Sequence, residues 1–193
     1  MTEAEILAIL KETNVWQKGH FRFTSGRHSD QYLQCAQLLQ YPKYAAKICT
    51  ELATHFQADR IDTVIGPALG GIIIAYEVAR VLGVRAIFAE REEEKMLLRR
   101  GFQIEKGERV LVVEDVITTG GSVNEVMELV TMNGGLIVGV GALVDRSRGR
   151  AEFGVKMVSL LQMDLIDYSP AECPLCQQGI PIIKPGSRKN PAK

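Results

Sequence analysis

Short apolar runs alternate along this chain with segments whose apolar positions recur at helical spacing. An uninterrupted apolar run is typical of a strand that is buried on both faces of a sheet. Alternation of strands and helices favours right-handed crossovers, and therefore a parallel sheet with helices on both faces. The pattern predicts strands at residues 63–66, 84–89, 110–113, 136–144 and 157–162, with helices at 71–82 and from Ser122 to Gly134.

Two further helices are predicted nearer the N-terminus. Thr2-Glu-Ala-Glu5 has the sequence of a capping box, and the apolar residues Ile6, Leu7 and Leu10 follow it. Pro42 suits the first turn of a second helix, whose apolar positions continue to residue 56 on one face. Between these helices, residues 19–29 mix aromatic, basic and small side chains and predict short strands joined by a turn.

The strand at residues 110–113 is followed by the acids Glu114 and Asp115 and then by a loop of hydroxyl and glycine residues. Ser122-Val-Asn-Glu125 reads as a capping box, which predicts that a helix begins there. Free N–H groups in such a loop, together with the helix dipole, favour a bound phosphate. The segment is neither a Walker loop nor a G-x-G-x-x-G dinucleotide motif. It predicts an anion site with acidic groups beside it.

Composition excludes several classes of function. The 193 residues carry 23 acidic and 23 basic side chains, so the formal net charge is zero. The overall charge therefore gives no argument for a nucleic-acid or membrane partner. The longest apolar run is too short to span a bilayer, the N-terminus has no secretory pattern, and four cysteines do not suggest a disulfide scaffold. We expect a single cytoplasmic domain over residues 1–193, with residues 188–193 frayed.

The segment from Glu114 to Ser122 resembles the motif with which type I phosphoribosyltransferases bind 5-phosphoribosyl-1-diphosphate (PRPP). The resemblance implies an α/β fold: a central, mainly parallel sheet flanked by helices, with a small hood formed by residues 19–40 and 163–187. It also implies that the two acids hold the ribose hydroxyls and that the loop holds the 5′-phosphate. The PRPP-binding residues here would be Glu114, Asp115, Val116, Ile117, Thr118, Thr119, Gly120, Gly121 and Ser122.

A glycine-rich segment, Gly66-Pro-Ala-Leu-Gly-Gly-Ile72, joins a predicted strand to a helix. Three glycines allow the backbone to approach a ligand closely, although such a loop is often only a tight turn. Beside the Glu114 motif it resembles the pyrophosphate loop of the family, although many orotate-using members have lysine where Gly70 stands. The resemblance assigns Ala68, Leu69 and Gly70 to PRPP.

Residues 90–101 are rich in charge, and taken alone they predict a solvated helix or loop with charge pairs. In the implied fold they occupy the place of a mobile catalytic loop that closes over PRPP and excludes water. Arg91 and Lys95 match that loop's cations and would bind PRPP and act in catalysis together with Asp115. The family's further lysine and its histidine are absent, and Arg99 and Arg100 are candidates to replace them.

Residues 23–29 with Tyr32, and Asp145-Arg146 after a strand, resemble the branch of the family that uses orotate. Taken alone, residues 145–150 are equally consistent with a basic turn on the surface. The guanidinium of Arg146 would face the orotate carboxylate. Thr24 stands where many members have a lysine. The resemblance assigns Ser25, Gly26, Thr118 and Arg146 to orotate.

The implied reaction transfers ribose 5-phosphate from PRPP to N1 of orotate, giving orotidine 5′-monophosphate and pyrophosphate. Mg²⁺ would be held mainly by PRPP near Glu114 and Asp115, with no direct protein ligand assigned. The family works as homodimers whose catalytic loop reaches the partner's site. Two alternatives remain: transfer to another base such as a purine, or a non-enzymatic regulator that binds PRPP. Because neighbouring strand residues face opposite sides, we expect the chain to leave strand geometry at the two acids.

Cys173-Pro-Leu-Cys176 has the spacing of half a zinc site. A closed site needs four ligands, and Cys35 and Cys49 lie far away in the sequence without a second C-x-x-C. The sequence therefore favours unligated cysteines. Among the histidines, His28 belongs to the substrate-like segment, whereas His20 and His55 are expected to be structural or exposed.

Overall fold

A six-stranded sheet forms the centre of the computed structural model, which describes residues 1–23, 25–93 and 95–185. Neighbouring strands are parallel, and the exception is the antiparallel pair β4–β5. The mainly parallel sheet expected from the apolar runs is therefore confirmed. The order is β5-β4-β3-β6-β7-β8, with β3 Thr63–Pro67, β4 Arg85–Glu92, β5 Lys95–Leu98, β6 Arg109–Ile117, β7 Leu136–Asp145 and β8 Lys156–Gln162.

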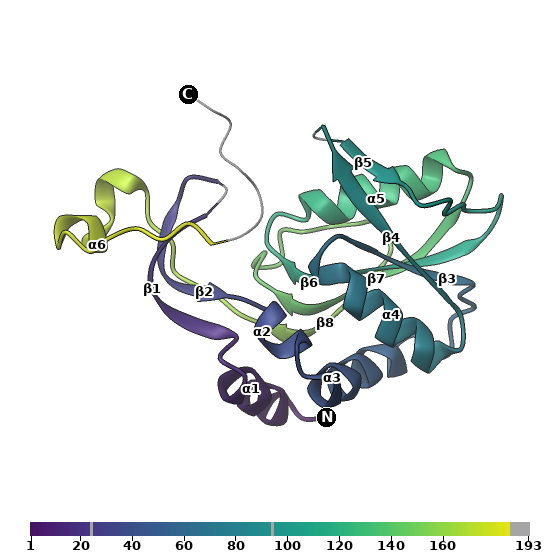
Figure 1. Ribbon diagram of the computed structural model, residues 1–193, viewed down its shortest axis with the longest axis horizontal. Coiled ribbons are helices and arrows are strands. Elements are labelled where there is room, and N and C mark those ends of the chain that lie inside the picture. The colour runs from purple at the N-terminus through teal and green to yellow at the C-terminus, as the bar shows by residue number, and fades with distance from the viewer. Residues whose placement is uncertain (24, 94, 186–193) are drawn as a thin grey trace.

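Helices cover both faces of this sheet (Figure 1). Leu111 and Val113 of β6 pack with one group of helices, and Val110 and Val112 pack with α5 on the opposite face. Burial on both sides explains why residues 110–113 of this strand are all apolar. The first group consists of α1 Glu3–Glu12, α3 Pro42–Thr54 and α4 Gly70–Leu82, with the short α2 Ala36–Leu39 beside them, while α5 spans Gly121–Met132.

The predicted helix ends are confirmed in three places and wrong in one. Thr2 forms a capping box with Glu5, Pro42 stands in the first turn of α3, and Gly83 ends α4 in the left-handed conformation. The capping box predicted at Ser122 does not form. Helix α5 begins one residue earlier, after Gly120, which has a φ of 78° and offers no side-chain cap. Glycine reaches that conformation without steric cost, so the chain turns into the helix before Ser122.

A two-stranded hairpin lies beside the main sheet, formed by β1 Trp16–Arg22 and β2 His28–Leu33 (Figure 1). A C-terminal segment containing η1 Pro170–Glu172 and α6 Pro174–Gln177 packs against it. The contact is partly backbone pairing, of His28 with Tyr168 and of Phe21 with Ile183. We call the hairpin and residues 163–185 the side lobe. Residue 24 and the tail predicted to fray lie outside the described residues.

The charged segment at residues 90–101 is a β-hairpin and not the helix or loop that its composition suggests. Met96 and Leu98 of β5 pack against the core cluster that also contains residues of α5, and Leu97 between them is partly buried as well. No alternation of polar and apolar residues marks this strand in the sequence, and its pairing with β4 defines it. Ion pairs of Arg100 with Glu90 and of Arg99 with Glu92 join the residues that follow β5 to strand β4.

Within the described residues, no helix is long and apolar enough to cross a bilayer.

Candidate functional site

Glu114 and Asp115 lie within β6, near its carboxyl end. The strand continues through both acids to Ile117, so the expected departure from strand geometry is wrong. Each carboxyl group accepts a hydrogen bond from the backbone of the next residue: Asp115 N donates to Glu114 Oε1 at 3.1 Å, and Val116 N donates to Asp115 Oδ1 at 2.7 Å. The side chains of the two acids therefore lie close to the strand backbone.

Burial raises the pKa of the Asp115 carboxyl above its ordinary value. The hydrogen bonds from Val116 and with Glu114 favour the ionised form, but they do not outweigh the loss of solvation. A pair of adjacent carboxyl groups offers several oxygens that can accept hydrogen bonds from neighbouring hydroxyls. This chemistry suits a sugar diol.

The glycine-rich loop passes directly beside Asp115. It follows β3, and its Ala68 N donates to Ala89 O at 2.8 Å; the peptide bond between Ala68 and Leu69 is cis. A Cβ at Gly70 would collide with the carboxylate of Asp115, and one at Gly66 would collide with the backbone of Gly71. The close approach that the three glycines predict is therefore present, and it brings this loop to the acid pair.

Residues 118–120 form the turn between β6 and α5. Gly120 is buried against the ring of Phe153, which sequence reasoning missed because no periodic pattern marks that residue. In the part of the chain that the structure describes, the N–H groups of Thr118, Thr119 and Gly120 donate no hydrogen bond. Gly121 N has only a long contact of 3.5 Å, to Thr119 Oγ1. Unused amides at a helix N-terminus are a ready receptor for a phosphate.

Cations of the β4–β5 hairpin lie to one side of this turn. Arg91 forms an ion pair with Glu125 of α5, the helix that begins at the turn. Lys95 stands opposite Glu92 at the end of the hairpin and is exposed. The ion pairs recorded among the described residues do not include Lys95. Its ammonium group is therefore available for an anionic ligand.

Arg146 lies just beyond β7, on the other side of the turn. Its backbone N donates to Ile117 O at 2.7 Å, and its guanidinium carbon lies 4.9 Å from the ring centre of Phe23 in the side lobe. Among the described residues its buried Nε finds no partner. Burial lowers the pKa of Arg146. An unsatisfied buried guanidinium donor is costly, which favours an acceptor supplied by a ligand.

The side lobe completes this part of the site. Ser25 and Gly26 form its turn, in which Gly26 has a φ of +82° and donates to Phe23 O at 3.0 Å. Tyr32 of β2 lies close enough to Asp115 and Arg146 for their charges to act on it, and its own burial raises its pKa. Within the described residues, no contact joins Ser25 or Lys95 to the acid pair. The structure thus gathers the acids, the glycine loop, the turn and Arg146, with Ser25 and Lys95 at the periphery.

Comparison with known proteins agrees with this geometry. Residues 34–175 match the phosphoribosyl transferase domain family. Orotate phosphoribosyltransferase of Pelotomaculum thermopropionicum is 60% identical over 189 residues, covering 98% of this chain and 100% of that protein. Its counterpart from Caldanaerobacter subterraneus is 59% identical, with the same coverage. A crystal structure of orotate phosphoribosyltransferase from Aeropyrum pernix superposes with a TM-score of 0.70 at 29% identity, over 82% of this chain and 93% of that one. The chain therefore belongs to the phosphoribosyltransferase family and, within it, to the orotate phosphoribosyltransferases.

Proposed function

We propose that this protein transfers the ribose 5-phosphate of PRPP to N1 of orotate, the step that yields orotidine 5′-monophosphate for UMP synthesis. The observation that carries the choice of orotate is the buried Nε of Arg146, which lacks a partner among the described residues and lies just beyond the end of the strand beside β6. A planar carboxylate would satisfy such a guanidinium through two parallel hydrogen bonds. The names of the similar proteins point to the same substrate.

The site accounts for how PRPP would be held. The free amides of Thr118, Thr119 and Gly120 would receive the 5′-phosphate, and the carboxyl groups of Glu114 and Asp115 would bind the ribose hydroxyls. The loop at residues 68–70 would then face the pyrophosphate, since it lies against Asp115. Holding both reactants in this way turns a bimolecular reaction into one between oriented groups.

In the transfer, the bond between C1′ and N1 forms as the bond between C1′ and the pyrophosphate oxygen breaks. The bonding pair leaves with pyrophosphate, and the N1 proton is released to solvent. The demanding part is the negative charge that grows on the leaving group while the ribose becomes positive. Lys95 and Arg91 are the cations of the β4–β5 hairpin that we propose for the leaving group.

The donor set suits Mg²⁺, because Glu114 and Asp115 offer hard carboxylate oxygens and PRPP offers phosphate oxygens. When bound, the ion would neutralise charge on the pyrophosphate. We also propose that the β4–β5 hairpin closes over PRPP in a homodimer, reaching the partner's site, and that the protein works in the cytoplasm. The family resemblance supports these points.

The proposal is tested by mixing the protein with PRPP and Mg²⁺ and offering orotate, uracil, adenine and guanine in separate assays. Loss of orotate absorbance together with release of pyrophosphate is the expected result for orotate alone. If a purine reacted at a comparable rate, the proposed substrate would be that purine and not orotate. Binding of PRPP without turnover of any base would favour the non-enzymatic regulator.

A further inference from the structure

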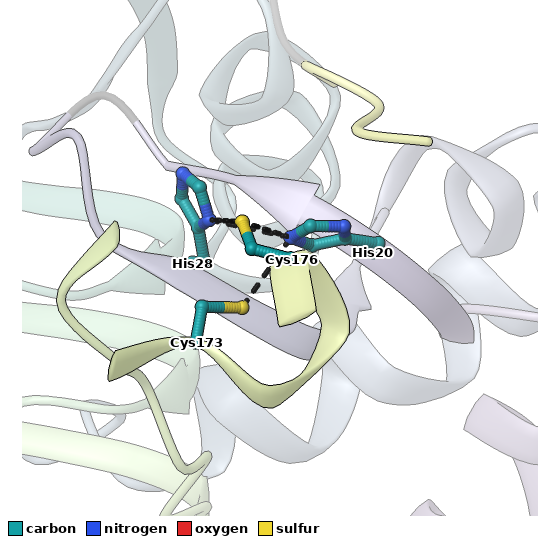
Figure 2. A group of neighbouring side chains, drawn as sticks. All are labelled: His20, His28, Cys173 and Cys176. Carbon is teal, nitrogen blue, oxygen red and sulfur yellow. Dashed lines mark hydrogen bonds between the residues drawn. The ribbon is translucent and has the colours of Figure 1, made fainter. Parts of the chain in front are cut away.

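Four side chains that could bind a metal converge inside the side lobe, away from the site described above. His20 comes from β1 and His28 from β2, whereas Cys173 precedes the short α6 of the C-terminal segment and Cys176 lies within it. Figure 2 shows the two rings and the two thiols pointing toward a common centre. One ligand atom from each residue lies within 4.8 Å of all the others.

The distances within this cluster match those of a tetrahedral metal site. His20 Nε2 lies 3.2 Å from His28 Nδ1 and 3.4 Å from Cys173 Sγ, while Cys176 Sγ lies 3.7 Å from the same His20 atom and 3.3 Å from His28 Nδ1. Zinc bonds of about 2.0–2.1 Å to nitrogen and about 2.3 Å to sulfur place neighbouring ligands about 3.3–3.8 Å apart in a tetrahedron. Four of the six distances between the ligand atoms thus lie close to that range, and the other two, from Cys173 Sγ to His28 Nδ1 and to Cys176 Sγ, are at most 4.8 Å.

A second contact orients one of the ligands. His20 Nδ1 lies 2.7 Å from Ile180 O, and a carbonyl oxygen only accepts, so this nitrogen carries the proton. The lone pair of His20 is then on Nε2, the atom that faces the cluster. Metal-binding histidines usually donate their other N–H to an oxygen in this way.

Burial argues that the cluster has a binding role. Cys173, His20 and His28 are 0%, 1% and 4% exposed, and Cys176 is partly exposed. Without a metal, the two facing imidazole nitrogens could share one hydrogen bond with each other, and the remaining contacts would be to thiol groups, which are weak hydrogen-bond donors. Polar groups buried in that state are costly, whereas a metal satisfies all four at once.

We propose that His20, His28, Cys173 and Cys176 bind a structural zinc ion. Two sulfurs and two imidazole nitrogens in tetrahedral arrangement select zinc over magnesium or calcium, which prefer oxygen ligands. Two thiolates and two neutral imidazoles also balance the charge of the ion. Four protein ligands leave no open position for a substrate, so the site holds the fold together and takes no part in chemistry.

The ion would join parts of the chain that are distant in sequence: His20 and Cys173 are 153 positions apart. It would fasten the C-terminal segment to the hairpin whose turn contains Ser25 and Gly26 and whose Phe23 lies against Arg146. Metal loss should therefore loosen the side lobe while leaving the central sheet folded. The zinc site does not depend on the reaction proposed above.

Elemental analysis of the full-length protein tests the site. We expect one zinc per chain after purification and dialysis against a weak chelator, and a fall to less than a tenth of that in Cys173→Ser and in Cys176→Ser. Cys49→Ala, which changes a buried cysteine outside the cluster, and His55→Gln, which changes an exposed histidine, should keep the full amount. Wild-type protein without zinc, or variants that retain it, would overturn the proposal.

Cobalt substitution keeps the test decisive if the cysteine variants fail to fold. Refolding the wild-type protein with Co²⁺ in place of zinc should give the intense visible bands of a tetrahedral ion and a sulfur-to-cobalt charge-transfer band in the near ultraviolet. His28→Gln should alter these bands, and His55→Gln should not. Weak octahedral bands, or no charge-transfer band, would show that the two cysteines do not bind the ion together.

Discussion

Gly70 and Asp115 approach so closely that no side chain fits between them. One belongs to the glycine loop after β3 and the other to the acid pair on β6, so this contact joins two parts of the proposed PRPP site. The blocking atom is the carboxylate of Asp115, the end of a side chain that can rotate, and not fixed backbone. A substituent at Gly70 would therefore displace the acid before it disturbed the fold.

Gly70→Ala should accordingly lower kcat/KM for PRPP roughly tenfold to a hundredfold, since small misplacements in an active site can cost about 10²-fold. Its melting temperature should stay close to that of the wild type. Gly135→Ala is the contrasting control, because its Cβ would press at 2.8 Å on core side chains of Ile104 and Val130. That variant should lose stability and keep its kinetic constants. A Gly70→Ala enzyme with normal PRPP kinetics would contradict the proposed contact.

Asp115→Asn should raise the melting temperature at pH 7. Burial raises the pKa of the Asp115 carboxyl, so between its unfolded and folded values the native state binds more protons. Stability then falls as the pH rises through that window, and the asparagine removes this loss. The gain should disappear below about pH 4, where the unfolded carboxyl is protonated too. Activity should be lost at every pH.

Glu90→Gln should change the melting temperature in the opposite direction to Asp115→Asn. The hydrogen bond from Arg100 lowers the pKa of Glu90, so its contribution to stability is present above the unfolded value and is lost as the pH falls. This variant should melt at a lower temperature than the wild type at pH 7, and the difference should fade in acid. Thermal melts of both variants across the pH range would check the two signs; parallel shifts in the same direction would contradict them.

Lys95→Ala should reduce kcat by roughly 10²–10³, by comparison with removal of a charge-stabilising donor in other enzymes. The KM for PRPP should change much less, because the cation acts mainly on charge that develops as pyrophosphate leaves. Lys47→Ala, at an exposed position on α3, is the control and should behave as the wild type. Steady-state kinetics with orotate in excess separate the two constants. An unchanged kcat would remove Lys95 from catalysis.

Arg146→Lys should raise the KM for orotate roughly tenfold to a hundredfold, since hydrogen bonds to charged groups are worth about 1.5–3 kcal/mol. Lysine keeps the charge but cannot form two parallel bonds to a carboxylate. Arg148→Lys is the control in the same loop, because Arg148 is ion-paired with Asp164. Its orotate KM should stay normal. An unchanged KM for orotate in Arg146→Lys would contradict the proposed contact between Arg146 and the orotate carboxylate.

Local pattern was enough to predict the central sheet and the acid pair and glycine turn that follow its buried strand. The valines and leucine at residues 110–113 are buried on both faces, and the acids and glycines that follow them are adjacent in sequence. Pattern failed where the outcome depends on contacts elsewhere. Residues 96–98 are three apolar residues in a row beside a charged segment, and the pairing of β5 with β4 decides their structure.

The cluster of two histidines and two cysteines was not predicted from the sequence, for a different reason. Its cysteines are close together in sequence, but its histidines belong to two strands near the other end of the chain, and only the hairpin register brings His20 beside His28. No local spacing of residues encodes that encounter. Of the two alternatives expected for His20, structural or exposed, its burial excludes the exposed one.

The pairing of Phe21 with Ile183 has a consequence for biosynthesis. The hairpin is translated early, but the segment that covers it emerges from the ribosome much later. Until then Phe21 and His20 lack the residues that pack against them. The side lobe of the nascent protein therefore stays incomplete while the sheet forms. A stalled ribosome that exposes residues only up to β8 should carry a folded sheet and a protease-sensitive hairpin.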